Sequence, residues 1–323
     1  MNKNKKHGII VLIVIGIIIL FSVANSFIPQ KKGRNQREIR PNPEMHFILN
    51  KKAPSSGYIA AIKIEGVIQE ASTQYNQEWL LDTIKDLKED KANAGIALFI
   101  ESPGGSVYEA DEAYLALQDY KTSGKPVWAY QGSLAASGGY YISCAADKIY
   151  ANRNTLTGSI GVIMGSSYDL TALFEKLGVK SETIHSGSNK NMFNINEPVT
   201  EEQRKIMQDL ADECYNQFAG IVSMSRNIPI VEVKKIADGR IYSASQAIKN
   251  GLIDGIDSWD GMISKMEEDC FSGKDNKVVW YSYEYTPSFR DFVLGGLFTG
   301  GEKKTLSNAL SKISMRYPAY LYE

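Results

Sequence analysis

Cysteine and histidine are scarce in this chain of 323 residues, with three of each. The cysteines Cys144, Cys214 and Cys270 form no CxxC pair and show no metal-ligand spacing. Their odd number argues against a complete disulfide framework, so we expect buried free thiols and no metal site. An excess of charge of one sign is also lacking, because 36 lysine and arginine residues are balanced by 37 aspartate and glutamate residues. A nucleic-acid partner would need a basic surface, and none is predicted.

One long apolar run is present, at the N-terminus. Residues 8–24 contain no charged side chain, and the polar-poor stretch continues to Ile28. Since about 20 helical residues cross the hydrocarbon core of a bilayer, we expect residues 1–28 to form a short cytoplasmic tail and a transmembrane anchor. The three lysines before the run also fit a cleaved signal peptide, but the run is long for one and its small-residue cleavage signal is poor.

Composition divides the rest of the chain into three parts. Residues 29–56 contain four prolines and many charges, which is typical of a linker. Residues 57–272 alternate strand and helix patterns, which predicts an α/β domain with a mostly parallel sheet covered on both faces. Residues 273–323 are a C-terminal extension, which either packs loosely or docks on a membrane or a neighbouring subunit.

The apolar periodicities give the expected elements. Strands are expected at 58–68, 94–102, 126–130, 148–151, 160–164, 179–186 and 278–285. Helices are expected at 76–90, 107–121, 170–178, 200–225, 230–238, 243–250 and 258–269. The long helix after Pro198 has Thr200 as its N-cap and Gln203 at the capping-box position.

Two clusters of small residues follow buried strands. Residues 101–106 read ESPGGS, and adjacent glycines let a backbone N–H approach an oxyanion, although PGG is also an ordinary turn. Residues 132–141 read GSLAASGGYY and put Ser137 at the start of a helix, where N–H groups favour developing negative charge. Tight packing of alanine and glycine against a strand is the alternative explanation.

Two further clusters are polar loops. Residues 155–161 read TLTGSIG, and residues 186–192 read SGSNKNM with Lys190 at their centre. A lysine in a loop is by default a solvated charge, so this pattern alone does not identify a site.

Taken together, the clusters resemble the signal peptide peptidase A family, also called protease IV, in its short single-domain form. The segments SPGGSV, GSLAASGGYYIS, TGSIGV, SG-x-x-K-x-M and GRIYSASQA-x-x-x-GLID occur in the family's order over about residues 58–260. The resemblance implies the crotonase and Clp-protease type of fold, an α/β superhelix of ββα units, here preceded by the N-terminal transmembrane helix.

The resemblance also implies the chemistry. Ser137 would be the nucleophile and Lys190 the general base of a serine endopeptidase, with Ser159 orienting the lysine. The backbone N–H groups of Gly105 and Gly138 would form the oxyanion hole, and no cofactor is implied. Family members cleave remnant signal peptides and other hydrophobic peptides at the membrane. In the short form, Lys190 would reach Ser137 of a neighbouring subunit in a ring-like homo-oligomer.

The sequence departs from the family pattern at two places. After Lys190 it reads Asn191-Met192-Phe193-Asn194, where Tyr-Lys-Asp and a Ser-Pro stretch are usual. The SPGG segment is preceded by Glu101, where asparagine is common. The surroundings of the lysine are therefore expected to differ from those in other members.

A serine hydroxyl needs a base before it attacks a carbonyl. Among the histidines, His7 and His46 lie outside the predicted domain, which leaves His185 for a Ser-His-Asp triad. A structural role for His185 is the simpler interpretation. A lysine serves as base only when neutral, and with a reference pKa of about 10.4 neutrality at pH 7 costs about 4.6 kcal/mol. Burial in an apolar site supplies a shift of that size.

The sequence allows two orientations of the domain in the membrane and two rival functions. The basic residues that follow the span lean toward a cytoplasmic domain by charge counting, whereas the family resemblance implies a single-pass protein of the cell membrane with an extracytoplasmic domain. We follow the resemblance. A crotonase-fold acyl-CoA enzyme and a catalytically silent membrane scaffold are the alternatives. Membrane anchoring and the Ser137–Lys190 pair argue against the first, and the retained Ser, Lys and double glycine argue against the second.

Overall fold

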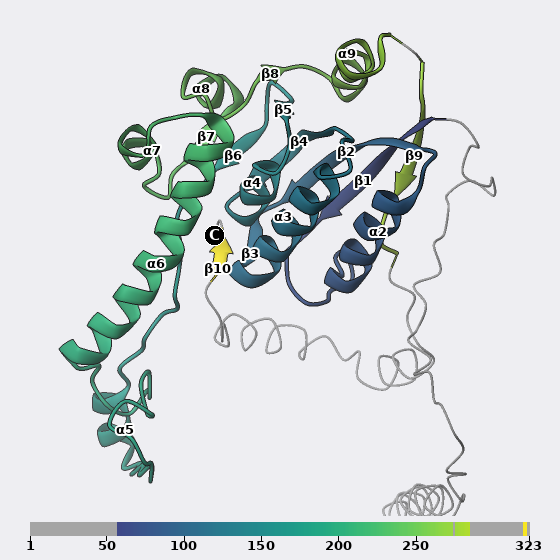
Figure 1. Cartoon of the computed structure of the whole chain (residues 1–323). Coiled ribbons are helices and arrows are strands. Elements are labelled where there is room, and N and C mark those ends of the chain that lie inside the picture. The colour runs from purple at the N-terminus through teal and green to yellow at the C-terminus, as the bar shows by residue number, and fades with distance from the viewer. Residues whose placement is uncertain (1–56, 274, 285–318, 322–323) are drawn as a thin grey trace, which may run out of the picture. The chain divides into compact units, whose positions relative to one another are not determined.

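The computed structural model describes residues 57–273, 275–284 and 319–321 (Figure 1). Within these ranges eight strands form one sheet in the order β7-β6-β4-β2-β1-β9, with β5 beside β4 and β8 beside β5. All neighbouring strands run parallel except β6 and β7. The strands are β1 (Tyr58–Glu65), β2 (Asn93–Ser102), β4 (Val127–Ala136), β5 (Lys148–Ala151), β6 (Leu156–Gly158), β7 (Ile241–Ser243), β8 (Gly255–Ile256) and β9 (Lys277–Tyr281).

Helices cover both faces of this sheet, as the alternation of strands and helices predicted. α2 (Gln77–Glu89), α3 (Val107–Lys121) and the short α4 (Gly138–Ser143) lie side by side on one face (Figure 1). Their apolar side chains and alternate residues of the central strands form the larger core. The intervening strand residues point to the other face, where α9 (Trp259–Phe271) packs on them in a second, smaller core.

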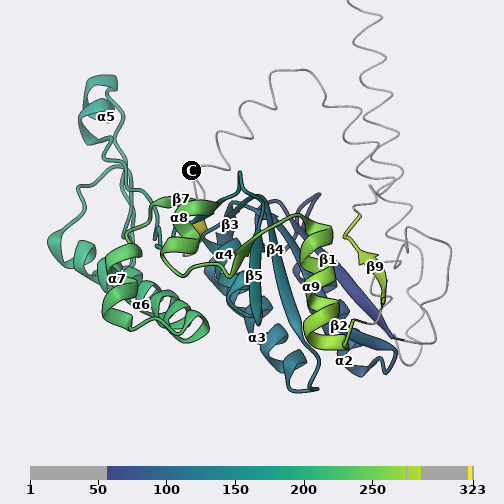
Figure 2. The ribbon, with the colours of Figure 1, turned by 90° about the horizontal axis from the view of Figure 1, so that it is seen from above.

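A long segment between the sheet strands β6 and β7 leaves the core. We call residues 161–217 the arm; they include α5 (Thr171–Leu177) and most of α6 (Glu201–Arg226). The whole arm is described, and none of its residues is buried. Both views show α5 and the first turns of α6 away from the sheet (Figures 1 and 2).

The base of the arm is held firmly. The last turns of α6 bury Phe218, Ala219, Ile221 and Val222 in the larger core. Arg226, at the end of α6, donates to the carboxylate of Asp254 at 2.9 Å and to the Gly251 carbonyl at 2.9 Å. After α6 the chain returns through α7 (Ile230–Ile236) to β7 of the sheet, and α8 (Ala244–Lys249) then connects β7 to β8.

Two expected strands are wrong. Residues 160–164 do not form a strand; the chain pairs with β4 slightly earlier, at Leu156–Gly158, and then turns at Ser159, whose φ is 51°. Residues 179–186 include the β-branched Val179, Thr183 and Ile184, but the whole segment is exposed and irregular. They lie in the arm, and without a neighbouring strand an extended segment has no backbone partners.

The C-terminal extension supplies two strands to the described structure. β9 adds to the edge of the main sheet by pairing with β1, and it lies within the region where a strand at 278–285 was expected. β10 (Ala319–Leu321) instead pairs antiparallel with β3 (Gly104–Ser106) in a separate two-stranded sheet. In the described part of the chain no helix is both long and apolar enough to cross a membrane. The expected span, tail and linker, residues 1–56, lie outside the described residues.

Candidate active site

Ser137 lies between β4 and α4 in an unusual backbone conformation. Its φ of 53° and ψ of −116° are rare for a residue with a side chain, and such strain costs about 1–3 kcal/mol. Two hydrogen bonds hold it there: its N–H donates to Gly158 O at 2.7 Å, and its carbonyl accepts from Tyr141 N at 2.8 Å. The sharp turn from strand to helix therefore aims the Ser137 side chain.

The Ser137 hydroxyl has no hydrogen-bond partner in the described structure, although the residue is 0% exposed. Leaving a buried hydroxyl unpaired costs about 1–3 kcal/mol. A serine that served packing alone could be replaced by alanine at no such cost. A buried, unpaired hydroxyl at this position is therefore better explained by a catalytic role than by packing.

β3 carries the glycine pair of the ESPGGS segment along the backbone of Ile68. Ile68 N–H donates to Gly104 O at 2.9 Å, and Ser106 N–H donates to Ile68 O at 2.8 Å. A Cβ on Gly105 would overlap the Ile68 carbonyl, so only glycine fits. Because Gly104 and Ser106 use this side of the strand, the N–H of Gly105 points to the other side.

Gly138 brings a second backbone N–H to the same place. A Cβ on Gly138 would lie 3.2 Å from the Gly105 nitrogen, so the two backbones are in close approach. Gly138 opens α4, and the first N–H groups of a helix have no intrahelical acceptor. The two donors expected of an oxyanion hole therefore lie together beside Ser137.

Ser102 supports this loop and was not singled out from the sequence. Its buried hydroxyl donates to Gly66 O at 2.6 Å and accepts from Gly104 N–H at 3.0 Å. It thereby ties the end of β1 to the start of β3. The signal was present in the ESPGGS segment, but sequence alone does not indicate where a short hydroxyl points.

Ser159 lies near Ser137, whereas Lys190 does not. Ser159 follows Gly158, which pairs with Ala136 and accepts the Ser137 N–H, and it is 5% exposed. Lys190 is exposed in the arm, in a turn closed by its N–H to Gly187 O at 3.0 Å. Within one chain the structure thus joins four of the predicted site residues and leaves the lysine apart.

Other candidate groups are not placed at this site. His185 lies exposed in the arm, with Nδ1 3.1 Å from Gly187 O. Cys144 follows α4, and burial raises the pKa of its thiol to about 12, which keeps it a neutral, unreactive thiol. Among the described residues, no group of three or more His, Cys, Asp or Glu side chains is arranged to hold a metal ion.

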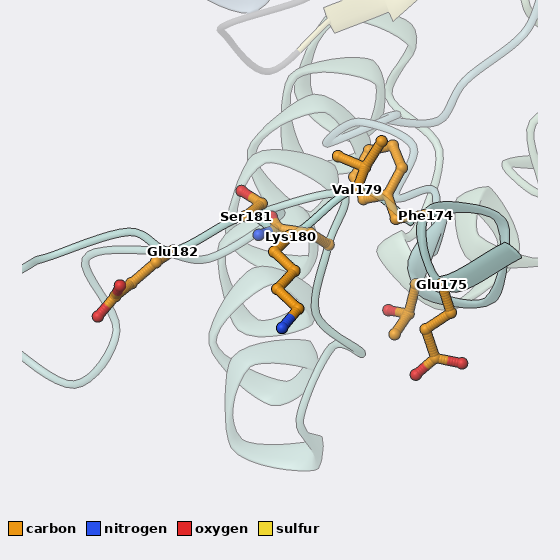
Figure 3. A pocket seen from close by; sticks show the side chains of 8 residues that line it. Phe174, Glu175, Val179, Lys180, Ser181 and Glu182 are labelled. Atoms are coloured by element: carbon orange, nitrogen blue, oxygen red, sulfur yellow. The ribbon is translucent and has the colours of Figure 1, made fainter. Parts of the chain in front are cut away.

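A cavity of about 420 Å³ lies in the arm rather than beside Ser137 (Figure 3). It is open to solvent and lies between α5 and the irregular segment that follows it. Its lining is Thr171, Phe174, Glu175, Val179, Lys180, Ser181, Glu182 and Asn196. None of the predicted site residues lines it.

An extended chain lies on the free side of β3. Tyr320 of β10 is paired with Gly105, with Ala319 and Leu321 opposite Ser106 and Gly104. β10 also contacts α4. The edge of β3 next to Ser137 therefore accepts a peptide backbone in antiparallel register.

Known proteins resemble the chain over most of its length. The model of peptidase family S49 matches residues 119–270, which include Ser137, Ser159 and Lys190. A candidate signal peptide peptidase SppA of Enterococcus faecium is 35% identical over 301 residues, 88% of this chain and 86% of that protein. Protease 4 of Salmonella typhi is 30% identical over 267 residues, 82% of this chain and 42% of that protein.

A plant relative extends the comparison. The chloroplastic serine protease SPPA of Arabidopsis thaliana is 27% identical over 256 residues, 78% of this chain and 38% of that protein. The strained Ser137 and the neighbouring Gly138 lie within the match to the family model. The chain therefore belongs to peptidase family S49, the family of signal peptide peptidase A and protease 4, and is a serine protease.

Proposed function

We propose that the chain is a membrane-anchored endopeptidase that uses a dyad of Ser137 and Lys190 to cleave hydrophobic peptides, remnant signal peptides among them. The observation that carries the proposal is the buried, unpaired hydroxyl of Ser137 beside the backbone nitrogens of Gly105 and Gly138. A nucleophile that has no partner among the described residues requires a base from elsewhere.

The reaction follows from these groups. The neutral amine of Lys190 takes the proton of Ser137 as its Oγ attacks the substrate carbonyl, and the N–H groups of Gly105 and Gly138 stabilise the oxyanion. Collapse of this intermediate breaks the peptide bond, and the protonated lysine gives its proton to the leaving amine. Water, deprotonated by the lysine, then hydrolyses the acyl-serine ester. Ser159 would orient the lysine amine.

The lysine of this proposal comes from a second copy of the chain, in a ring-like homo-oligomer. Lys190 belongs to the arm, which buries no residue of its own. Several large apolar side chains of the arm are exposed, including Leu177 at 66% and Ile184 at 94%. A partner that packed on the arm would cover these side chains. Docking of the arm on a neighbour would also exclude water from the amine, which favours its neutral form.

β10 supports the substrate class. It lies along β3 as an extended backbone, and peptide binding by strand addition uses such an edge. A hydrophobic peptide would present its scissile carbonyl to Gly105 when it lies in this register. The apolar run at residues 8–28 would anchor the domain on the extracytoplasmic side, near such substrates.

Mixing inactive chains tests the shared dyad. Ser137→Ala and Lys190→Ala chains, each inactive alone, are expected to regain peptidase activity when co-expressed, because some interfaces then hold one intact serine and one intact lysine. Covalent labelling of Ser137 by a fluorophosphonate is the parallel readout, with Ser137→Ala as its blank. Mixed chains that co-assemble, as shown by two affinity tags, and stay inactive would contradict a dyad shared between chains.

The membrane orientation is tested separately. Added protease should digest the domain in cells stripped of their wall but otherwise intact, and a cytoplasmic marker protein should survive the same treatment. Survival of the domain until the cells are lysed would reverse the proposed orientation.

A further inference from the structure

The register between β2 and β4 breaks just before the site. Ile100 is opposite Gln131, and Ser102 is opposite Ala135. One residue of β2, Glu101, therefore spans the length that three residues of β4 occupy. This bulge lies only a few residues before Ser137, so its shape sets where the nucleophile emerges from the sheet.

The Glu101 carboxylate closes the bulge. Its Oε2 accepts the N–H of Ser133 at 2.7 Å, and its Oε1 accepts the Ser133 hydroxyl. Hydrogen bonds to an ionised acceptor are stronger than those between neutral groups. Gly132 leaves room for the carboxylate, because a Cβ there would overlap Glu101 Oε2.

The bulge is the point where β4 exchanges partners. Trp128 to Gln131 pair with β5, and Leu134 to Ala136 pair with β6. On the side away from β2, the buried hydroxyl of Thr155 donates to Gly132 O at 2.6 Å, and that of Thr157 donates to Ala135 O at 2.8 Å. On the β2 side, the hydrogen bonds from Ser133 to the Glu101 carboxylate fix the bulge in the same way.

The same end of β2 also fixes the other half of the site. Glu101 O accepts from Gly66 N–H at 3.0 Å, and the next residue, Ser102, bonds both Gly66 O and Gly104 N–H. Adjacent residues thus hold the glycine loop through Ser102 and the nucleophile strand through the Glu101 side chain. The distance between the oxyanion donors and Ser137 depends on this dipeptide.

We propose that Glu101 is a positioning residue of the peptidase reaction, which sets the place of Ser137 by bonding the bulge at Ser133. The inference rests on the proposed function of Ser137 as nucleophile. Glu101 itself contacts no reacting atom. Its loss would let the bulge relax, and a small displacement of a nucleophile is enough to lower a rate by one to two powers of ten.

The test measures how fast Ser137 of the purified full-length protein is acylated by a fluorophosphonate. Glu101→Ala is expected to lower the acylation rate constant at least about tenfold and to lower kcat for a peptide with little change in KM. Glu101→Gln keeps an acceptor for the Ser133 N–H and should stay within about threefold of the unmodified protein. Ser133→Ala removes only the hydroxyl and should also retain most of the rate.

Gly132→Ala supplies a second route to the same defect. Its methyl group displaces the carboxylate without changing Glu101, so it should slow acylation as Glu101→Ala does. In the double variant Glu101→Ala/Gly132→Ala the losses should not multiply, because both act through one contact. Multiplying losses would overturn the coupling.

The acylation rates of the unmodified protein and of Glu101→Ala also decide between the inference and its alternatives. If Glu101→Ala lowers the melting temperature but leaves the acylation rate unchanged, Glu101 serves stability alone. If the unmodified protein is not labelled at Ser137, the proposed function fails and this inference fails with it. Labelling of the unmodified protein and equal labelling of Glu101→Ala would sink the inference alone.

Discussion

Ser137 combines two features that a residue chosen for stability would lack. Its φ is positive although it has a side chain, and its buried hydroxyl has no hydrogen-bond partner in the part of the chain that the structure describes. Gly158 and Tyr141 hold its backbone in this conformation through hydrogen bonds on both sides. These hydrogen bonds therefore offset part of the free-energy cost of the strained Ser137 backbone.

Ser137→Ala is expected to stabilise the protein while removing its activity. In the separated single chain, deleting a buried hydroxyl that has no partner among the described residues should raise the free energy of unfolding by about 1 kcal/mol, since no hydrogen bond within the chain is lost and a desolvated polar atom is removed. Chemical denaturation of both proteins measures this difference. Ser143→Ala is the matched control, because the Ser143 hydroxyl is buried but bonded to Gly139 O at 2.8 Å and its loss should destabilise. A destabilised Ser137→Ala protein would mean that the hydroxyl has a partner.

Gly105→Ala is expected to abolish the oxyanion site. The added Cβ would overlap the backbone carbonyl of Ile68, which cannot move aside as a side chain does, so β3 must shift away from Gly138. Loss of one aligned donor typically lowers kcat by at least about a hundredfold. Steady-state hydrolysis of a peptide measures the loss. Gly220→Ala in α6 has open space around its Cβ and should leave kcat unchanged.

At the scale of elements, the sequence predicted best where a segment's own pattern decided its structure. The helix at 107–121 and the strand at 148–151 have the expected bounds, and the capping box of Thr200 and Gln203 is confirmed. These features depend on local periodicity and on one side chain reaching its neighbour's backbone. The α/β class followed from the same patterns.

Elements that depend on a distant partner were missed or misplaced. β4 was expected to end at residue 130, but it continues past the bulge to Ala136 because β6 pairs with its last residues. β3 and β10 are short strands that are defined by their pairing with each other and, for β3, by the bridge between Gly105 and Ile68. Of the site, Ser137 and both glycines were identifiable from motifs, whereas Ser102 and Glu101 act through contacts that no local pattern specifies.

An ion pair strengthens the junction of α6 with the sheet domain. Arg226 has a side chain only 7% exposed, and Asp254 also accepts the N–H of Ile149 at 2.7 Å. Arg226→Met should remove the hydrogen bonds to Asp254 and Gly251 and lower the free energy of unfolding by about 2 kcal/mol. Calorimetry would then record a fall in melting temperature of about 4–8 °C.

The control for this change lies on the surface. Arg240 pairs with Asp238 in an exposed ion pair, so Arg240→Met should leave the melting temperature nearly unchanged. Equal effects of both substitutions would mean that the Arg226 pair does not anchor α6.

For the whole molecule, the described structure divides the candidate site residues between the sheet domain and the arm. Ser137, the oxyanion donors and Ser159 come together within the sheet domain, while Lys190 lies in the exposed arm. In the proposed oligomer the exposed apolar side chains of the arm would pack on a second copy of the chain, and each copy would supply one lysine for each serine. The family resemblance implied that the two residues serve one reaction across two neighbouring chains, and this stays a prediction.

The C-terminal strand and a substrate require the same edge of β3. Tyr320 is paired with Gly105, whose N–H a substrate carbonyl would need, so β10 and a bound peptide exclude each other. Deleting residues 319–323 should therefore lower KM for an extended peptide and speed fluorophosphonate labelling of Ser137, with little effect on the melting temperature. Tyr320→Pro, which removes the N–H that faces β3, should act in the same direction, whereas Tyr320→Ala retains the backbone bond and should change little. Slower labelling after the deletion would mean that β10 supports the site rather than competing for it.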